Sequence, residues 1–185
     1  MSKSLVKLVD YSLLPAALMV IGKFVGLWLS IQLFSLEWGI KNIPNSLFSV
    51  VPEFYAEDIH LASTYSDLIM FLILVIGFSI ILVQALYLHN SHIAPTTLVR
   101  LATNNLLGLV KSSFEIYHRA AIWSVFIWIS NILIFINVIF SRTDLWVFVF
   151  SILISVIITV ALLRDAFKEI ELTKKELTIR YDQND

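Results

Sequence analysis

The stretch LIMFLILVIGFSIILVQALYL, residues 68–88, decides the fold class of this chain. It contains no charged residue, and its length matches the roughly 20 apolar residues that an α-helix needs to cross the hydrocarbon core of a membrane. A helix satisfies the hydrogen bonds of its own backbone, which lipid cannot do. The stretch therefore predicts a membrane-spanning helix.

Three further apolar runs have a similar length and lie at residues 13–36, 120–140 and 145–163. The composition agrees with this pattern, because 58% hydrophobic and 15% charged residues would be extreme for a soluble domain. We therefore predict an all-α integral membrane protein in which residues 1–185 form a single membrane domain of four transmembrane helices. Four spans in 185 residues leave no room for a separate soluble catalytic domain.

The first run follows two basic residues, Lys3 and Lys7, as the apolar segment of a signal peptide does. It is longer than the apolar segment of a signal peptide and is followed by Trp38 rather than by a small-residue cleavage site. We expect it to be a retained anchor.

Basic residues are distributed unequally between the two sides of the predicted spans. Ten of them lie before the first run, in the connection between the second and third runs, or in the tail, against Lys41 and Arg142 on the opposite side. The positive-inside rule then places both termini in the cytoplasm. We expect a multi-pass protein of the cell membrane, either a plasma membrane or an inner membrane.

Residues 37–66 are predicted to be an outer loop. The loop is acidic, since it contains one lysine and four carboxylates, Glu37, Glu53, Glu57 and Asp58. A solvated loop is the simplest interpretation, and attraction of cations or of a basic partner is the alternative. Pro52 indicates a short helix after it, and Thr64 with Asp67 has the spacing of a capping box that would begin the second span.

Residues 95–119 are predicted to form an amphipathic helix on the cytoplasmic side. From Thr97 to His118, basic and polar residues share one face of the helical projection and leucines occupy most of the rest. Such a helix can lie at the membrane interface. The competing interpretation is a cytoplasmic extension of the third span. Residues 164–185 form the cytoplasmic tail.

Small residues at helical spacing predict close helix contacts in two runs. Gly22 and Gly26 form a GxxxG pattern in the first, and Ser151, Ser155 and Thr159 recur at every fourth position in the last. The sequence leaves open whether these helices pack within one chain or between two.

Lys23 is the most unusual residue, because it lies well inside the first apolar run. A lysine near the centre of a membrane costs about 2.5 to 3.5 kcal/mol and needs compensation. Ser30 lies on the same helix, and Gln84, Asn131 and Asn137 are the candidate partners in other runs. The hypothesis is a ligand or partner site on these residues, with no carboxylate because Asp67 and Asp144 are placed at outer ends. The alternatives are a structural lysine, or a span shifted so that Lys23 lies nearer water.

Two His-containing pairs give a weak indication of a metal site. His89 with His92, and Glu115 with His118, have one-turn spacing and lie on the predicted inner side. Imidazole and carboxylate can bind zinc or iron if the two segments meet. We expect no cofactor, because the pattern has few carboxylate ligands and histidines at the membrane interface explain it more simply.

Other functional classes have little support in the sequence. The net charge of −1 gives no basic field for nucleic acid, and the absence of cysteine excludes disulfides and thiolate chemistry. We find no phosphate-binding loop and no hydrolase motif. We therefore expect no enzymatic activity and predict a non-catalytic interaction, assembly or accessory subunit, bound to another membrane protein or to further copies of itself. The alternative is an oligomeric transporter or channel that uses Lys23 and the internal amides, and a membrane metalloenzyme comes last.

Overall fold

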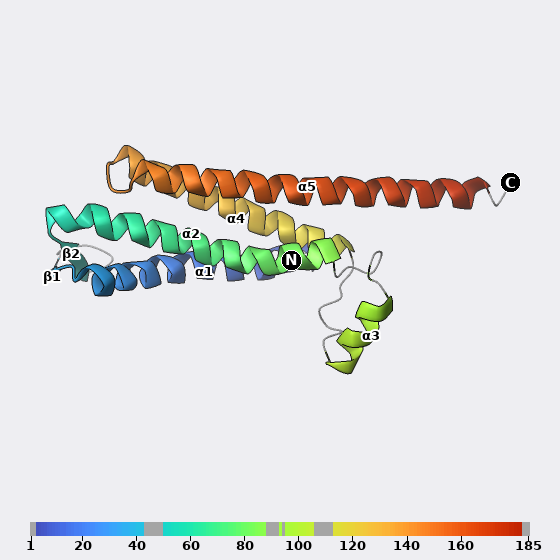
Figure 1. The fold of residues 1–185 in the computed structure, drawn as a ribbon, viewed down its shortest axis with the longest axis horizontal. Helices are drawn as coiled ribbons and strands as arrows, with labels where there is room; N and C mark the ends of the chain where they lie inside the picture. Colours follow the sequence, from blue (N-terminus) through green and yellow to red (C-terminus); the bar gives the residue numbers. More distant parts are fainter. Residues whose placement is uncertain (1–2, 43–49, 88–92, 94, 106–112, 183–185) are drawn as a thin grey trace. The chain divides into compact units, whose positions relative to one another are not determined.

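The computed structural model describes residues 3–42, 50–87, 93, 95–105 and 113–182, and these residues are nearly all helical. The elements along the chain are α1 (Lys3–Phe34), β1 (Trp38–Asn42), β2 (Val50–Phe54), α2 (Ala56–Tyr87), α3 (Pro95–Thr103), α4 (Ser113–Ile139) and α5 (Leu145–Asp182) (Figure 1).

Four helices are long and apolar enough to cross a membrane. The qualifying segments are Val6–Phe34, Asp58–Tyr87, Phe114–Ile139 and Leu145–Glu171. This confirms the prediction of a multi-pass membrane protein with four apolar helices. Each helix continues past one end of the apolar run that predicts it, because hydropathy marks what can lie in lipid and does not mark where helical hydrogen bonding stops.

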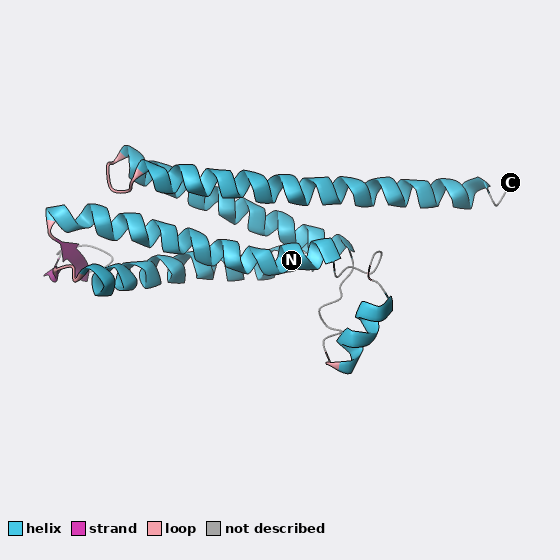
Figure 2. Ribbon diagram, in the orientation of Figure 1, coloured by secondary structure: helices cyan, strands magenta, loops and turns pink. Residues whose placement is uncertain are grey.

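The predicted loop at residues 37–66 contains a strand pair and the first three turns of α2. Strands β1 and β2 pair antiparallel, with Ile40 opposite Pro52, and helix α2 already begins at Ala56 (Figure 2). Pro52 therefore belongs to a strand of a two-stranded sheet, where a missing N–H is tolerated at an edge. Thr64 and Asp67 lie within α2 and do not cap its start.

The single amphipathic helix predicted from Thr97 to His118 is also wrong. Helix α3 ends at Thr103, and Asn105 has a φ of 56°, the left-handed conformation that commonly follows a helix C-terminus. Helix α4 then begins at Ser113, so the last residues of the predicted helix belong to the third span. Asparagine adopts this conformation more readily than most residues, which explains why the helix ends here.

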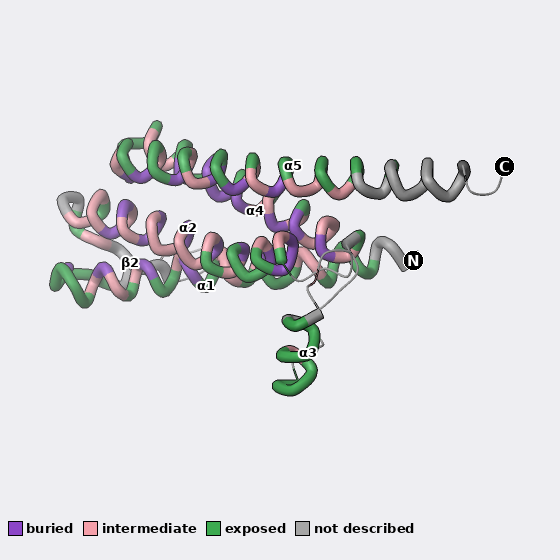
Figure 3. Tube along the Cα trace, turned by 45° about the vertical axis from the view of Figure 1, so that its right-hand side comes forward, coloured by how far each residue is buried: buried purple, intermediate pink, exposed green. Residues whose placement is uncertain are grey.

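Contacts divide the chain into two compact units. One comprises Met1–Ile76 with Phe126–Leu153, and the other comprises Gly77–Val125 with Ile154–Asp185. Helix α2 is the most buried of the four spans, with 39% of its apolar window buried against 22–28% in the others (Figure 3). Much of the remaining apolar surface is exposed, as expected for helices that face lipid.

In the first unit, α1 and α2 approach closely at two glycines. A Cβ atom added at Gly22 would lie 3.0 Å from Met70 Cα, and one added at Gly26 would lie 2.7 Å from Ser66 Cα. The GxxxG pattern therefore joins two helices of the same chain, because only glycine leaves room for the neighbouring backbone.

The first unit also contains the turn between α4 and α5. Ser141 has a φ of 53°, and the backbone N–H of Arg142 donates to the carbonyl of Asn137 at 2.8 Å. A second bond runs from the N–H of Ser141 to the carbonyl of Val138 at 2.9 Å. These two bonds form a Schellman motif, which satisfies the last carbonyls of α4 and reverses the chain into α5.

The second unit holds the other ends of α2, α4 and α5. Phe78 and Trp123 stack with ring centroids 6.5 Å apart, and the Tyr117 hydroxyl donates to Asp165 Oδ2 at 2.7 Å. Of the predicted packing ridge, Ser151 lies in the first unit and Ser155 and Thr159 lie in the second. Both serines are fully buried, and Thr159 donates to the carbonyl of Ser155 at 2.7 Å.

Candidate functional site

A lysine and an aspartate form an ion pair in the first unit. The Lys23 ammonium, on α1, donates to Asp67 Oδ1, on α2. The close approach at Gly22 and Gly26 brings these side chains together, because it aligns the two backbones at this level. The Ser66 hydroxyl adds a second link by donating to the carbonyl of Lys23 at 2.8 Å.

Two further side chains donate to the same carboxylate. Asp67 Oδ2 accepts from Asn137 Nδ2 at 2.8 Å and from the Thr143 hydroxyl at 2.6 Å. Asp67 is 1% exposed, so its charge depends on these donors and on Lys23 for stabilisation. The carboxylate therefore ties together α1, α2, α4 and the turn between α4 and α5.

The turn makes additional contacts with α2. The backbone N–H of Asp144 donates to the Thr64 hydroxyl at 3.1 Å, and the Ser63 and Thr143 hydroxyls lie 3.2 Å apart. His60 Nε2 lies 3.5 Å from Asp144 Oδ1. These contacts place the turn level with residues 60–67 of α2, well inside that helix.

The same contacts show that α1 and α2 extend past the turn. Helix α1 continues for eleven residues beyond Lys23, and α2 begins eleven residues before Asp67, which is about 16 Å of helix in each case. We call residues 24–42 and 50–66 the α1–α2 extension. It carries the β1–β2 hairpin at its end and reaches beyond the turn (Figure 1).

Two grooves meet at Lys23, whose side chain is 40% exposed despite its ion pair. One, of about 320 Å³, runs along α1, α2 and α4 and is lined mainly by apolar residues. The other, of about 330 Å³, is lined by Lys23, Arg142, two serines and apolar residues of the extension. Lys23 and Phe24 line both grooves.

The structure places the predicted partners of Lys23 in different positions. Asn137 donates to Asp67, the carboxylate that also accepts from Lys23. Ser30 is buried and donates to the carbonyl of Gly26 at 2.7 Å, and Asn131 donates to the carbonyl of Ile127 at 3.1 Å. Gln84 is buried and belongs to the second unit.

The exclusion of a carboxylate partner was wrong. The sequence predicts that Asp67 lies at the start of the second helix, because Thr64 and Asp67 have capping spacing and precede the apolar run. Helix α2 instead begins at Ala56, so Asp67 lies three turns inside the helix, where its side chain reaches Lys23 of α1. The signal in the sequence is the set of small residues Ala62, Ser63 and Ser66, which suits a helix face in contact with another helix.

The metal hypothesis finds no cluster of ligands in the part of the chain that the structure describes. Across those residues, no three His, Asp or Glu side chains are placed to hold a metal ion. His89 and His92 lie outside the described residues. Glu115 and His118 both lie on α4.

Comparison with known proteins gives no relative: no protein-family model, no curated protein and no solved structure matches this chain.

Proposed function

We propose that this chain is a non-catalytic assembly or accessory subunit of a membrane complex. Its α1–α2 extension binds a basic segment of a partner membrane protein just outside the hydrocarbon. The observation that carries the proposal is an aromatic, acidic cleft at the β1–β2 hairpin, on the part of the molecule that reaches beyond the α4–α5 turn.

The level of the membrane boundary supports this assignment. The polar groups of Lys23, Asp67 and the Arg142–Asp144 turn lie at one level, and apolar runs of about 20 residues begin there in α2 and α5 and end there in α4. A hydrocarbon core of about 30 Å therefore fits between this level and the opposite ends of the runs in α2, α4 and α5. The α1–α2 extension then stands outside the hydrocarbon.

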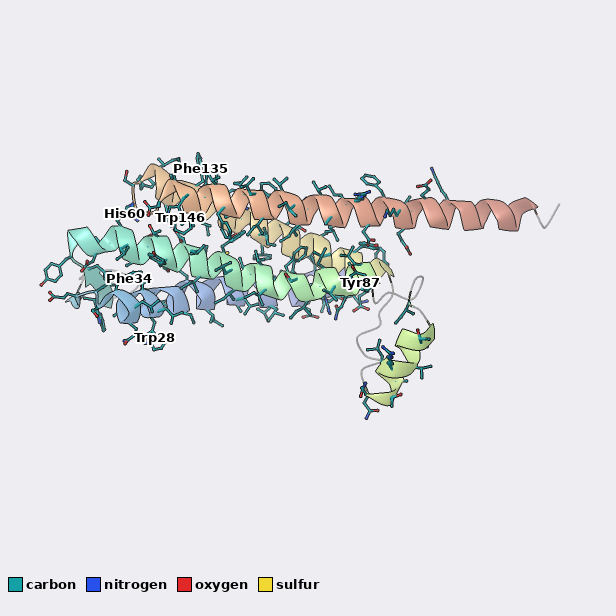
Figure 4. The ribbon with its side chains drawn as sticks, viewed as in Figure 1. Trp28, Phe34, His60, Tyr87, Phe135 and Trp146 are labelled. Atoms are coloured by element: carbon teal, nitrogen blue, oxygen red, sulfur yellow. The ribbon has the colours of Figure 1, made fainter. Side chains whose placement is uncertain are left out.

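The end of the extension is unusually apolar for such a position. Leu33 is 70% exposed, Trp38 52% and Tyr55 65%, although lipid does not reach them in this placement. Trp28 points away from α2 (Figure 4). Exposed aromatic residues outside lipid are typical of protein interfaces.

The cleft itself has a volume of about 870 Å³. Its lining combines Trp38, Phe54 and Tyr55 with Leu36, Ile59 and Glu37. An aromatic cleft with one carboxylate suits a peptide segment that carries an apolar anchor and a lysine or arginine.

The charge of the surrounding chain favours a different protein over a second copy. The stretch from Glu37 to Asp58 carries four carboxylates and one lysine. Two copies that met through this stretch would repel each other, because each copy carries the same net negative charge there. A basic partner gains from the same field.

The orientation completes the proposal. We place both termini and α3 on the cytoplasmic side of a plasma or inner membrane, as the distribution of basic residues favours. Helix α3 carries the exposed apolar residues Leu98 and Val99 beside Arg100, which suits a short helix on the membrane surface.

An oligomeric transporter or channel ranks second. The Lys23–Asp67 pair is neutral as a unit, and Asn137 and Thr143 hold its carboxylate. This arrangement suits a structural role better than ion transport. Breaking the pair to bind or release an ion would leave the buried Asp67 carboxylate without its countercharge.

Site-specific photo-crosslinking in intact membranes tests the proposed function. A photoreactive residue at Tyr55 should give a protein adduct of one defined mass, whereas one at Ile76, which is equally exposed on α2, should react with lipid. Glu37→Lys should remove the Tyr55 adduct, because it reverses the charge in the cleft. Adducts only to lipid at both positions, or an adduct that survives Glu37→Lys, would overturn the proposal.

A further inference from the structure

We infer that the two grooves at Lys23 form one binding site for a singly charged anionic phospholipid. The phosphate lies between Lys23 and Arg142, and an acyl chain follows the apolar groove along α1, α2 and α4. This site shares Phe54 and Ile59 with the cleft at the hairpin, but Lys23 and Arg142 do not line that cleft. The inference does not depend on the proposed partner.

The groove nearer the extension has the chemistry of a phosphate site. Lys23 and Arg142 both line it, together with the hydroxyls of Ser63 and Ser66. The Arg142 guanidinium lies 5.9 Å from the ring centroid of Phe140 and has no ion pair among the residues that the structure describes. Guanidinium and ammonium groups are the side chains that bind phosphate oxygens most strongly.

The other groove has the chemistry of an acyl-chain site. Met19, Val20, Met70, Leu133 and Ile136 line it, with Lys23, Asp67 and Asn137 at the polar part. Thioether and branched aliphatic side chains adapt to a flexible hydrocarbon chain. Since Lys23 and Phe24 line both grooves, a single molecule can occupy both.

The order of the two grooves matches the order of a lipid in a membrane. The cationic groove lies on the side of the extension and the α4–α5 turn, and the apolar groove continues along the helices in the direction of the spans. A lipid of the adjacent leaflet presents its phosphate and its acyl chain in that order. A free phosphate ion would leave the apolar groove unused.

The net charge of the site indicates which phospholipid headgroup it prefers. Asp67 neutralises Lys23, so Arg142 leaves the site with one net positive charge. Asp144 faces His60 at 3.5 Å, and neither of these residues lines the grooves. A phospholipid with one net negative charge therefore complements the site better than a zwitterionic one.

The experiment uses the purified full chain in a neutral detergent. Phosphatidylglycerol, phosphatidylcholine and inorganic phosphate are titrated separately, and native mass spectrometry counts the molecules bound to each chain. We expect one phosphatidylglycerol per chain, weaker binding of phosphatidylcholine, and no stable binding of inorganic phosphate. Phosphate that binds as tightly as the lipid would overturn the assignment to lipid.

Two arginine variants provide the matched comparison. Arg142→Gln should weaken phosphatidylglycerol binding about tenfold, because one charged hydrogen-bonding group is lost. Arg164→Gln, at an exposed arginine of α5 that lines neither groove, should leave it unchanged. Leu133→Trp narrows the apolar groove. It should weaken the binding of phosphatidylglycerol with normal acyl chains more than the binding of a short-chain analogue. Equal binding of the two lipids, with no change in Arg142→Gln, would overturn the inference.

Discussion

Asp67 shows at the scale of one residue how a lysine is accommodated in an apolar run. Lys23 lies 44 positions away in the chain, and its ammonium donates directly to the buried carboxylate. An unpaired charge costs free energy in a low-dielectric setting, and the Asp67 carboxylate accepts two further hydrogen bonds, from Asn137 and Thr143. Asp67 therefore needs Lys23 for charge stabilisation more than Lys23 needs Asp67, because Asp67 is buried and Lys23 is partly exposed.

This asymmetry predicts different costs for the two single substitutions. Lys23→Met should lower the free energy of unfolding by about 2 to 3 kcal/mol, because it leaves a buried carboxylate with two neutral donors. Asp67→Asn should cost only about 1 kcal/mol, since the remaining ammonium can reach water. Unfolding by denaturant in mixed micelles measures both values.

A double variant serves as the control for this prediction. Lys23→Met combined with Asp67→Leu removes both charges and should recover most of the loss caused by Lys23→Met. If the double variant is instead no more stable than Lys23→Met alone, the loss does not come from an unpaired buried carboxylate and the argument fails.

The sequence predicted that Lys23 needs a polar partner but not which one. The free-energy cost of placing a lysine in an apolar run depends on that residue alone, so the sequence is enough to predict it. The partner depends on the register between α1 and α2, which Gly22 and Gly26 set by close contact with Met70 and Ser66. That register is a tertiary property, and the early start of α2 at Ala56 was hidden by a polar stretch that suits a loop equally well.

At the scale of elements, the pair of helices α1 and α2 depends on glycine at the contact. Gly26 meets the backbone of Ser66, and a backbone cannot move aside as a flexible side chain can. The β1–β2 hairpin joins these same helices, although its sequence was interpreted as a loop. Its strands contain Gly39 and Pro52, two residues that weaken a strand pattern, so the pairing was not visible from composition.

Gly26→Ala should therefore separate α1 from α2 and destabilise the fold by about 2 kcal/mol. Gly39→Ala is the matched control, because nothing lies within 4 Å of the added carbon there. Thermal unfolding of both variants in the same detergent measures the difference. Equal midpoints for the two variants would show that the close approach at Gly26 is not required.

At the scale of the whole molecule, the distribution of basic residues predicts which ends face the cytoplasm. The natural chain has no cysteine, so single cysteines report without background. Among cysteines at Ser2, Ser49, Ser112 and Asp185, only the one at Ser49 should react with an impermeant reagent added outside the cell. A reaction at Ser112 under the same conditions would reverse the assignment.

The depth of α1 distinguishes the placement proposed here from the one that hydropathy alone predicts. Hydropathy predicts that the whole run of residues 13–36 lies inside the membrane, whereas the placement proposed here puts the boundary near Lys23, where its ammonium contacts Asp67. Leu13 and Leu33 lie ten residues on either side of Lys23, about 15 Å along the helix, and are 69% and 70% exposed.

Spin labels at these two leucines decide between the placements. Leu13→Cys should report contact with oxygen dissolved in lipid, because it lies near the middle of the hydrocarbon. Leu33→Cys should report contact with a water-soluble nickel complex, because it stands on the α1–α2 extension outside the hydrocarbon. The two positions share residue type, helix and exposure, so depth is the variable that differs. If both labels prefer oxygen, the extension lies in lipid, and its aromatic cleft is then a lipid-facing surface rather than a site for a soluble segment of a partner.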